Sequence, residues 1–273
     1  MLTRIAHTTD FSPQSAAAFL HALRLALDAG SRLDILHVEE HAQDDSWRSF
    51  PHVREILVRW GLLDDEAMPA DIESKLGVHV SKIDIEHRDA LSGVTEFFLS
   101  HRPDLVVVAT HGRQGINRWL HGSVSEDFAR RTHVPTLLIG PEGRSFVDAK
   151  TGQMSLRRIL LPVVPTPSPA RALLLLSSLL SPVGITGDCF ELINVADAMP
   201  DVLDDNGNTR KVERLEGPVV ETILKEAELR KVDLIAMPTT GHHGFLDALR
   251  GSTTSRVLAH APCPVLALPL IGA

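Results

Sequence analysis

The chain repeats itself, and this repeat constrains the fold more than any other feature of the sequence. Shifting the sequence by 129 positions aligns residues 104–112 with residues 233–241, and the match continues without a gap. Residues 104–139 show 10 identities in 36 positions. Unrelated sequence would give roughly one in twenty, so the match indicates a duplication. We therefore predict two copies of one domain, here named copy one and copy two.

Copy two is predicted to be the shorter copy. Its start aligns at a shift of 154, which pairs Arg4 and Ile5 with Arg158 and Ile159, and 154 exceeds 129 by 25 positions. The extra residues of copy one lie between positions 38 and 78, where residues 53–60 have helical spacing. Copy two has instead a short loop with Asp and Asn at 197–208. We expect copy two to lack a helix.

The two domains are predicted to span residues 1–143 and 154–273. Residues 140–152 join them and are rich in glycine, proline and polar residues, which is typical of an interdomain linker. No apolar segment resembling a secretory signal is present in the first ten residues, so we expect the mature chain to start here.

Within each copy, strand-like apolar runs alternate with helical patterns. In copy one the runs at 33–38, 78–85, 105–109 and 134–139 follow this order, with helices expected around 16–27, 94–98 and 124–131. The first helix is expected to bury Ala16, Phe19, Leu20, Leu23 and Leu27. The run at 105–109 is apolar at every position, which suits a parallel strand covered on both faces. A doubly wound α/β sheet is predicted, with ligands outside the carboxyl ends of its strands.

Composition argues for an ordinary globular protein. Hydrophobic residues make up 44% and charged residues 23% of the chain, which excludes disorder and a membrane protein. The net charge of -8 gives no electrostatic reason to bind nucleic acid or an anionic membrane. The 2 cysteines, Cys189 and Cys263, have no metal-ligand spacing, and we expect Cys263 to be buried and unreactive. A cytoplasmic location fits this composition best.

A glycine-containing loop after the apolar strand is the strongest local signal for a ligand. Gly112 follows the strand, and Gly122 and Ser123 open the next helix after nine intervening residues. Glycines allow close approach of a ligand, and the free N–H groups of Ser123, Val124 and Ser125 favour phosphate. The alternative is that Ser123 only caps the helix, since Glu126 completes a capping box.

Asp10 lies at the end of the first predicted strand, at the same sheet edge as Gly112. A carboxylate at this edge suits a ribose hydroxyl, as in other nucleotide-binding α/β folds. The alternative is a helix cap or an Asx turn before Phe11, Ser12 and Pro13.

These motifs resemble the universal stress protein family in its ATP-binding class. The likeness rests on Thr9 and Asp10 before Phe-Ser-Pro, the small residue Ala109 two positions before His111-Gly112, the nine-residue gap, and Gly122-Ser123. In copy two it rests on residues 241–253 and 261–265, so it covers nearly the whole chain. The resemblance implies two tandem Rossmann-like domains of the adenine nucleotide alpha hydrolase-like type, each a five-stranded parallel sheet flanked by helices. It also implies that domains pair, often through their last strands.

The resemblance assigns the candidate site residue by residue, with ATP, and Mg with it, as the expected cofactor. Thr8, Thr9 and Asp10 would lie near adenine and ribose, with the backbone of Val38 beside the adenine. The residues that would surround the ribose and phosphates are Ala109, His111, Gly112, Arg113, Gly115, Gly122, Ser123, Val124 and Ser125. Ala109 stands where the family has a glycine, and alanine is small enough to be tolerated.

Copy two departs further from the pattern. Val164 matches Asp10, so the ribose carboxylate is missing, and Pro238, which has no N–H, matches Ala109. Thr240 replaces His111. The remaining candidates for an anion site are Gly241, Gly251, Ser252 and Thr253. We predict that copy one binds nucleotide and that copy two binds weakly or not at all.

Three functions remain open from the sequence. The first is a nucleotide-dependent regulatory stress protein with an adenine nucleotide as ligand, an intramolecular pairing of the two copies, a regulatory protein partner, and pairing of chains left open. The second is a slow ATPase, although no GxSxG, GxxxxGK[ST] or HExxH motif and no general base is found. The third is a scaffold that binds a metal at His242 and His243 or another small ligand in copy two, although adjacent histidines rarely share one ion.

Overall fold

The computed structural model describes residues 2–39, 49–110, 133–141, 143–203, 207–239 and 253–270. The strands of copy one are β1 (Arg4–Thr8), β2 (Arg32–Glu39), β3 (Val80–Glu86), β4 (Leu105–Ala109) and β5 (Thr136–Ile139). They lie in the order β3-β2-β1-β4-β5, and every neighbouring pair is parallel. Copy one therefore forms the predicted five-stranded parallel sheet.

Copy two repeats this arrangement. Its strands are β6 (Ile159–Pro162), β7 (Phe190–Asn194), β8 (Val212–Arg214), β9 (Leu234–Thr239) and β10 (Val265–Pro269). They lie in the order β10-β9-β6-β7-β8, again with parallel neighbours. Ile5 pairs with Leu33 and Leu105, and its counterpart Ile159 pairs with Phe190 and Leu234. These registers fix which residues of the two copies are equivalent.

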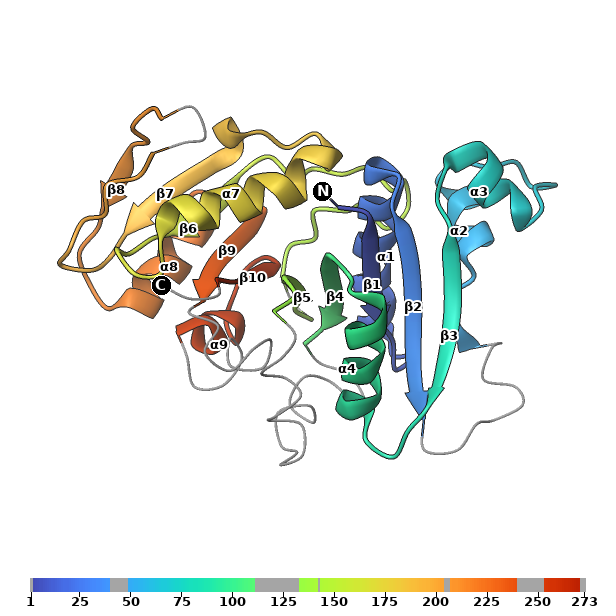
Figure 1. The fold of residues 1–273 in the computed structure, drawn as a ribbon. Coiled ribbons are helices and arrows are strands. Elements are labelled where there is room, and N and C mark those ends of the chain that lie inside the picture. Colours follow the sequence, from blue (N-terminus) through green and yellow to red (C-terminus); the bar gives the residue numbers. More distant parts are fainter. Residues whose placement is uncertain are drawn as a thin grey trace.

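The two sheets join through their last strands. β5 and β10 run antiparallel, with Leu138 opposite Val265 and Thr136 opposite Ala267. The result is one continuous sheet of ten strands, with β3 and β8 at its edges (Figure 1). An apolar final strand with an open edge would need a partner, and each copy supplies that partner to the other. The pairing of copies within one chain is therefore a feature of the fold.

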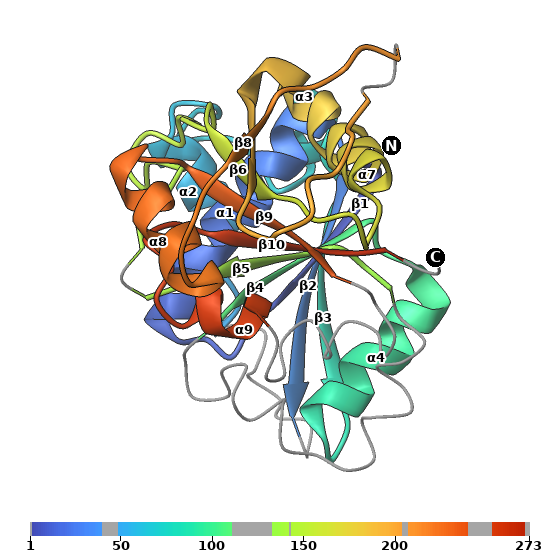
Figure 2. The same ribbon diagram turned by 90° about the vertical axis from the view of Figure 1, so that its left-hand side faces the viewer.

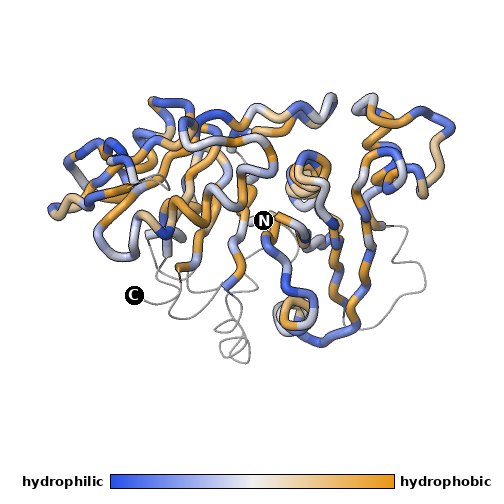
Figure 3. The backbone as a smooth tube through the Cα atoms, turned by 45° about the horizontal axis from the view of Figure 1, so that its top comes forward, coloured by the Kyte–Doolittle hydropathy of each residue, from blue (hydrophilic) through white to orange (hydrophobic). Residues whose placement is uncertain are grey.

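Helices cover both faces of this sheet. One face carries α1 (Pro13–Ala29) and α7 (Pro169–Leu180), whose buried residues belong to a single hydrophobic core that extends across both copies. The opposite face carries α4 (Ala90–His101) over copy one, and α8 (Val219–Leu229) and α9 (Thr253–Leu258) over copy two (Figure 2). Hydrophobic residues follow the strands, whereas the outer loops are largely hydrophilic (Figure 3). The sheet is thus doubly wound, as the sequence predicts.

Helix α1 has clear start and stop signals. Ser12 is its N-cap and accepts a hydrogen bond from the Ser15 N–H, Pro13 follows, and Gly30 ends the helix with a φ of 61°. Phe19 and Leu23 are buried as expected, but the predicted face is wrong at Ala16, which is exposed. Three consecutive alanines at 16–18 carry no signal for which of them faces the core.

The two copies differ between their second and third strands. Copy one has α2 (Val53–Arg59) and α3 (Ala70–Leu76) between β2 and β3. Between β7 and β8, the residues that the structure describes form no helix, and only an isolated bridge joins Leu203 to Thr209. Helices α2 and α3 therefore distinguish copy one from copy two.

The segment that joins the copies is packed against both of them. Phe146 and Val147 are buried, and the Phe146 ring contacts His21 of α1 edge to face at 4.6 Å. Arg144 forms an ion pair with Glu228 of copy two. Glycine and proline content indicated a linker, but composition alone does not show that its apolar residues enter the core. The domain boundaries at 143 and 154 stay predictions.

Among the described residues, no helix combines the length and the apolar character that crossing a bilayer requires. The apolar stretch at 170–182 falls almost entirely within α7, which is buried on one side.

Candidate functional site at the strand ends

Thr8, Thr9 and Asp10 follow one another at the carboxyl end of β1, in the middle of the copy-one sheet. Thr8 pairs with Leu36 of β2, and the Thr9 N–H donates to the Leu36 carbonyl at 2.8 Å. The carboxyl ends of parallel strands share one edge, so β1, β2 and β4 bring their terminal residues together there. This edge is the place at which the candidate residues gather.

The Thr9 hydroxyl is part of an internal network. Its Oγ1 accepts hydrogen bonds from the Ser15 hydroxyl at 2.9 Å and from the Phe11 N–H at 3.1 Å. The Thr9 carbonyl accepts a hydrogen bond from Nδ1 of His37 at 2.8 Å. Thr9 therefore ties the start of α1 and the end of β2 to the end of β1. Its side chain shapes the site, and its backbone N–H and carbonyl both form hydrogen bonds with β2.

Asp10 makes the Asx turn that the sequence left open. Its Oδ1 accepts a hydrogen bond from the Ser12 N–H at 3.0 Å, across Phe11, whose φ is 58°. Ser12, and not Asp10, caps α1. A carboxylate has about four acceptor sites, so a turn that uses one of them leaves the group able to accept further hydrogen bonds. Asp10 is half-buried, so it lies within reach of the surface of this edge.

Thr8 carries the polar atom at this edge that most needs a partner. Its Oγ1 is buried, and no hydrogen-bond partner for it is found among the described residues. Buried hydroxyls in native proteins are nearly always hydrogen-bonded, so this hydroxyl calls for a partner that the described residues do not supply. The α4 face of the sheet, on which Thr8 lies beside Leu36, also includes Val38.

Ala109 ends β4 and is buried, with Ile139 of β5 as its neighbour. The Thr110 N–H donates to the Ile139 carbonyl at 3.0 Å, which fixes the chain direction as it leaves the strand. The remaining candidates of this loop lie outside the described residues: His111, Gly112, Arg113, Gly115, Gly122, Ser123, Val124 and Ser125. The structure therefore shows where their loop begins and nothing of the loop itself.

Copy two presents apolar residues at the equivalent edge. Val163 is buried and Val164 is 36% exposed where copy one has Thr9 and Asp10. Pro238 lies in β9 opposite Leu268. Thr253 is the first residue of α9, whereas Gly241, Gly251 and Ser252 lie outside the described part of the chain, as do His242 and His243.

Two buried polar residues near the sites were not predicted from the sequence. His37 lies on β2, and Asn194 occupies the equivalent place on β7, where its Nδ2 donates to the Val163 carbonyl at 2.8 Å. The signal in the sequence that could have identified them is a polar residue inside a largely apolar strand. Asn194 also has a buried Oδ1 without a partner among the described residues.

His7 is a third buried polar residue that the sequence did not bring forward. Its Nδ1 donates to the Val107 carbonyl at 3.0 Å, and its ring packs beside Phe19. Burial lowers the pKa of His7 to about 4, which outweighs the hydrogen bond to Val107 and the charge of Asp10. The ring is therefore neutral near pH 7.

The described residues offer little to a metal ion or a reactive thiol. No group of three or more His, Cys, Asp or Glu side chains with the geometry of a metal site is found in that part of the chain. Cys263 is buried, and burial raises its pKa to about 12, so its thiol stays protonated as expected.

The fold and its polar strand ends define a tandem α/β protein with a candidate small-ligand site in copy one. The profile of the Universal stress protein family matches residues 1–140 and 188–269. The chain belongs to the universal stress protein family, in a form with two copies of the domain.

Individual relatives agree with this assignment. A universal stress protein of Methanocaldococcus jannaschii is 48% identical over 54 residues, which are 20% of this chain and 32% of that protein. The match thus spans about a third of that relative's length. A solved universal stress protein of Archaeoglobus fulgidus has a TM-score of 0.59 at 17% identity, covering 98% of this chain and 97% of its own. A functionally unknown protein of Pseudomonas aeruginosa has a TM-score of 0.63 at 15% identity, covering 98% and 92%. These two structures share the fold over the whole chain.

Proposed function

We propose that copy one binds an adenine nucleotide, ATP, at the carboxyl ends of β1, β2 and β4, and that copy two binds it weakly or not at all. Nucleotide occupancy then biases the conformation or partner binding of a regulatory stress protein. We propose that ATP acts as a bound ligand and not as a substrate, because no general base stands out at the described strand ends.

The observation that carries the proposal is the contrast between equivalent positions of the two copies. The end of β1 offers the Thr8 hydroxyl and the Asp10 carboxylate, whereas Pro162 and Val164 occupy these places at the end of β6. Ribose hydroxyls are bound by carboxylate acceptors in other α/β folds. Copy two has the same sheet without that acceptor, so the contrast favours a ribose-containing ligand in copy one.

The polar groups at this edge fit such a ligand. The Thr8 hydroxyl is buried without a partner in the described part of the chain, so a donor or acceptor from a ligand would satisfy it. Val38 is buried on the same face of the sheet. Its side chain packs closely against α4, since a Cβ added at Gly93 would lie 3.1 Å from the Val38 Cγ1. An apolar wall beside a buried hydroxyl is suited to the edge of an adenine ring.

The phosphate part of the proposal rests on the family resemblance. Gly112, Gly122 and Ser123 would surround the phosphates, and Mg would accompany them. A regulatory protein partner, pairing of whole chains and a cytoplasmic location belong to the same proposal. In this structure β5 and β10 pair with each other and leave no free edge at this junction. Pairing of whole chains would therefore have to use another surface.

The test is to denature the purified protein, quantify the adenine nucleotide released per chain, and then titrate ATP with Mg into the stripped protein by calorimetry. About one nucleotide per chain supports a single site in copy one, whereas about two contradicts the loss of function in copy two. If the protein releases no nucleotide and the stripped protein binds no ATP, the ATP assignment is refuted. Analysis of the same samples for ADP measures whether the bound nucleotide is hydrolysed.

A further inference from the structure

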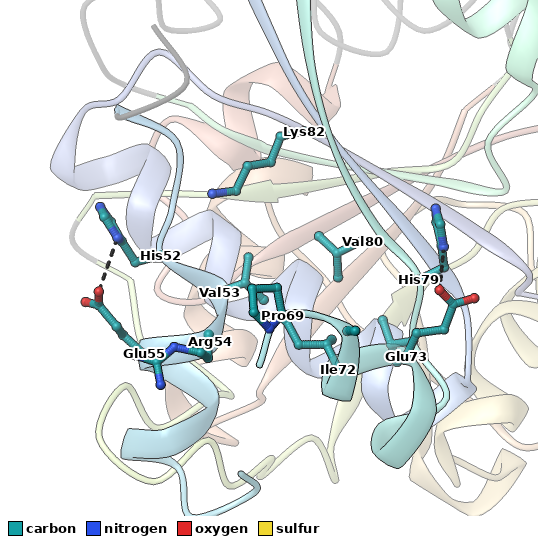
Figure 4. Close-up of a pocket in the computed structure, with 12 residues that line it drawn as sticks. His52, Val53, Arg54, Glu55, Pro69, Ile72, Glu73, His79, Val80 and Lys82 are labelled. Carbon is teal, nitrogen blue, oxygen red and sulfur yellow. Dashed lines mark hydrogen bonds and ion pairs between the residues drawn. The ribbon is translucent and has the colours of Figure 1, made fainter. Parts of the chain in front are cut away.

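Copy one contains a cavity that the nucleotide proposal does not use. It lies between α2, α3 and the start of β3, and its volume is about 330 Å³ (Figure 4). That volume is at the lower end of the range of small-ligand pockets. Copy two has no counterpart among its described residues, because no helix lies between β7 and β8 there.

The inner wall of this cavity is apolar. Val53, Ile72 and Val78 are buried, and each is at most 8% exposed. Pro69 and Val80 also line the cavity and lie beside these residues (Figure 4). A hydrocarbon group placed here would lose contact with water on several sides, which is favourable in proportion to the area removed from water.

The two acidic groups of the cavity lining each lie beside a histidine ring. Glu55 lies 3.3 Å from Nδ1 of His52, and Glu73 lies 3.0 Å from Nδ1 of His79. Figure 4 shows these two pairs at opposite ends of the cavity. The Arg54 guanidinium is also engaged, since its Nη1 donates to the Asp65 carbonyl at 2.8 Å.

Lys82 differs from the other charged residues of the lining. Its side chain extends from β3 across the cavity towards the His52 end (Figure 4). Within the described ranges, its ammonium group has no hydrogen-bond or ion-pair partner. The equivalent position of copy two is Val212, because Ile35 pairs with Lys82 as Leu192 pairs with Val212. The cation is therefore specific to the copy that has the cavity.

We propose that this cavity binds a small amphiphilic monocarboxylate, such as a medium-chain fatty acid, with its hydrocarbon on Val53, Ile72 and Val78 and its carboxylate at the Lys82 ammonium. Glu55 and Glu73 at the two ends disfavour a multiply charged anion such as a phosphate ester, whereas a single carboxylate is matched by a single ammonium. The site is independent of the nucleotide site at the strand ends.

The environment of Lys82 agrees with this assignment. The residue is exposed as a whole, but partial burial of its ammonium group lowers the pKa of Lys82, because the charged form loses hydration. A carboxylate ligand beside it would restore a favourable interaction to the charged form. Such a ligand would satisfy the cation and cover the apolar wall at the same time.

The experiment compares three probes of equal chain length on the full protein: octanoate, octanol and octylamine, each titrated by calorimetry. We expect octanoate to bind, octanol to bind about tenfold more weakly, and octylamine not to bind, since only the carboxylate forms a charge-assisted hydrogen bond with Lys82. Equal binding of octanoate and octanol, preference for octylamine, or no binding of octanoate would overturn the proposal.

Two variants locate the site. Lys82→Met should reduce the octanoate affinity to that of octanol, whereas Lys75→Met should leave it unchanged, because Lys75 pairs with Asp71 on α3 and does not line the cavity. Ala70→Trp should exclude both probes by filling the opening from the exposed start of α3. Retained octanoate affinity in Lys82→Met, or equal losses in Lys82→Met and Lys75→Met, would assign the binding to another place. Circular dichroism of each variant shows that it is folded.

Discussion

His37 donates from Nδ1 to the carbonyl of Thr9 at 2.8 Å, and this single bond joins the end of β2 to the turn that carries Asp10. Copy two makes the same bond at 2.8 Å with different chemistry, from the Asn194 amide to the Val163 carbonyl. Two different side chains thus donate to the equivalent backbone carbonyl in the two copies. Because both copies have this hydrogen bond, we expect it to stabilise the turn after the first strand whether or not a carboxylate follows.

Removing this donor should destabilise the protein. His37→Ala leaves the Thr9 carbonyl without its partner and loses the ring contact with Phe11, so we expect a loss of roughly 1–3 kcal/mol in the free energy of unfolding. His37→Asn should lose less, since Asn194 shows that an amide reaches the acceptor. Urea denaturation followed by circular dichroism measures both values. Equal losses in the two variants would show that the bond contributes nothing and that packing dominates.

Asp10→Ala should weaken ATP binding by about 1–3 kcal/mol if the carboxylate holds the ribose through charge-assisted hydrogen bonds. Calorimetric titration of ATP into the stripped variant measures the change. Val164→Ala is the matched control, because Val164 occupies the same place in copy two and should not affect the affinity. Unchanged affinity in Asp10→Ala would leave Asp10 with its Asx turn alone.

The stability of the protein should fall in mildly acidic solution because of its buried histidines. Burial lowers the pKa of His7 and of His21 to about 4, below the value near 6.5 of an exposed histidine. A lowered folded-state pKa means that the unfolded chain binds the proton more readily, so protonation favours unfolding. Their contribution to stability is therefore complete above about pH 6.5 and is lost as the pH falls towards 4.

The variant His7→Leu isolates this effect, since copy two has Leu161 at the equivalent position. We expect the stability difference between His7→Leu and the parent protein to grow by roughly 3 kcal/mol between pH 6.5 and pH 4. Urea denaturation at several pH values measures it. Parallel pH profiles for the two proteins would contradict the prediction, and His260→Gln, at an exposed position, serves as the control.

Gly152→Ala should disrupt the contact between the linker and α2. Gly152 has a φ of 69°, and an added Cβ would meet the Trp60 ring, whose Nε1 donates to the Ala149 carbonyl at 3.2 Å. Gly207→Ala is the control, since its φ of 78° is equally unfavourable but no atom of the described residues lies within 4 Å of the added Cβ. We expect Gly207→Ala to cost roughly 1 kcal/mol and Gly152→Ala about 1–3 kcal/mol more. Thermal unfolding compares them, and equal losses would show that Trp60 moves aside freely.

Much of the fold could be predicted because the strands are apolar and the repeat is long. The run at 105–109 corresponds to β4, and the shift of 154 between Ile5 and Ile159 agrees with their equivalent registers. Helix α3 was not predicted, because Ile72 is its one buried residue and a single position gives no periodicity. The packing of Phe146 was missed for a related reason, since one phenylalanine among polar and glycine residues does not form a pattern.

The candidate site could be predicted only in part. Thr8, Thr9 and Asp10 are consecutive, so their position at the end of a strand follows from the sequence. His37 and Asn194 each lie on one strand and donate to a carbonyl at the end of the adjacent strand. These hydrogen bonds depend on how the two strands pair, which the sequence of either strand alone does not show. Non-local pairing of this kind becomes visible only in three dimensions.

The antiparallel junction of β5 and β10 has a genetic consequence. In a homodimer with the same architecture, one gene would encode both halves, and every substitution would occur at both sites at once. Here the two halves of the sheet are inherited as separate segments of one chain, joined by β5 and β10. Copy two can therefore accumulate residues such as Val164 and Pro238 at its strand ends while it still supplies the β-strand that covers the edge of copy one.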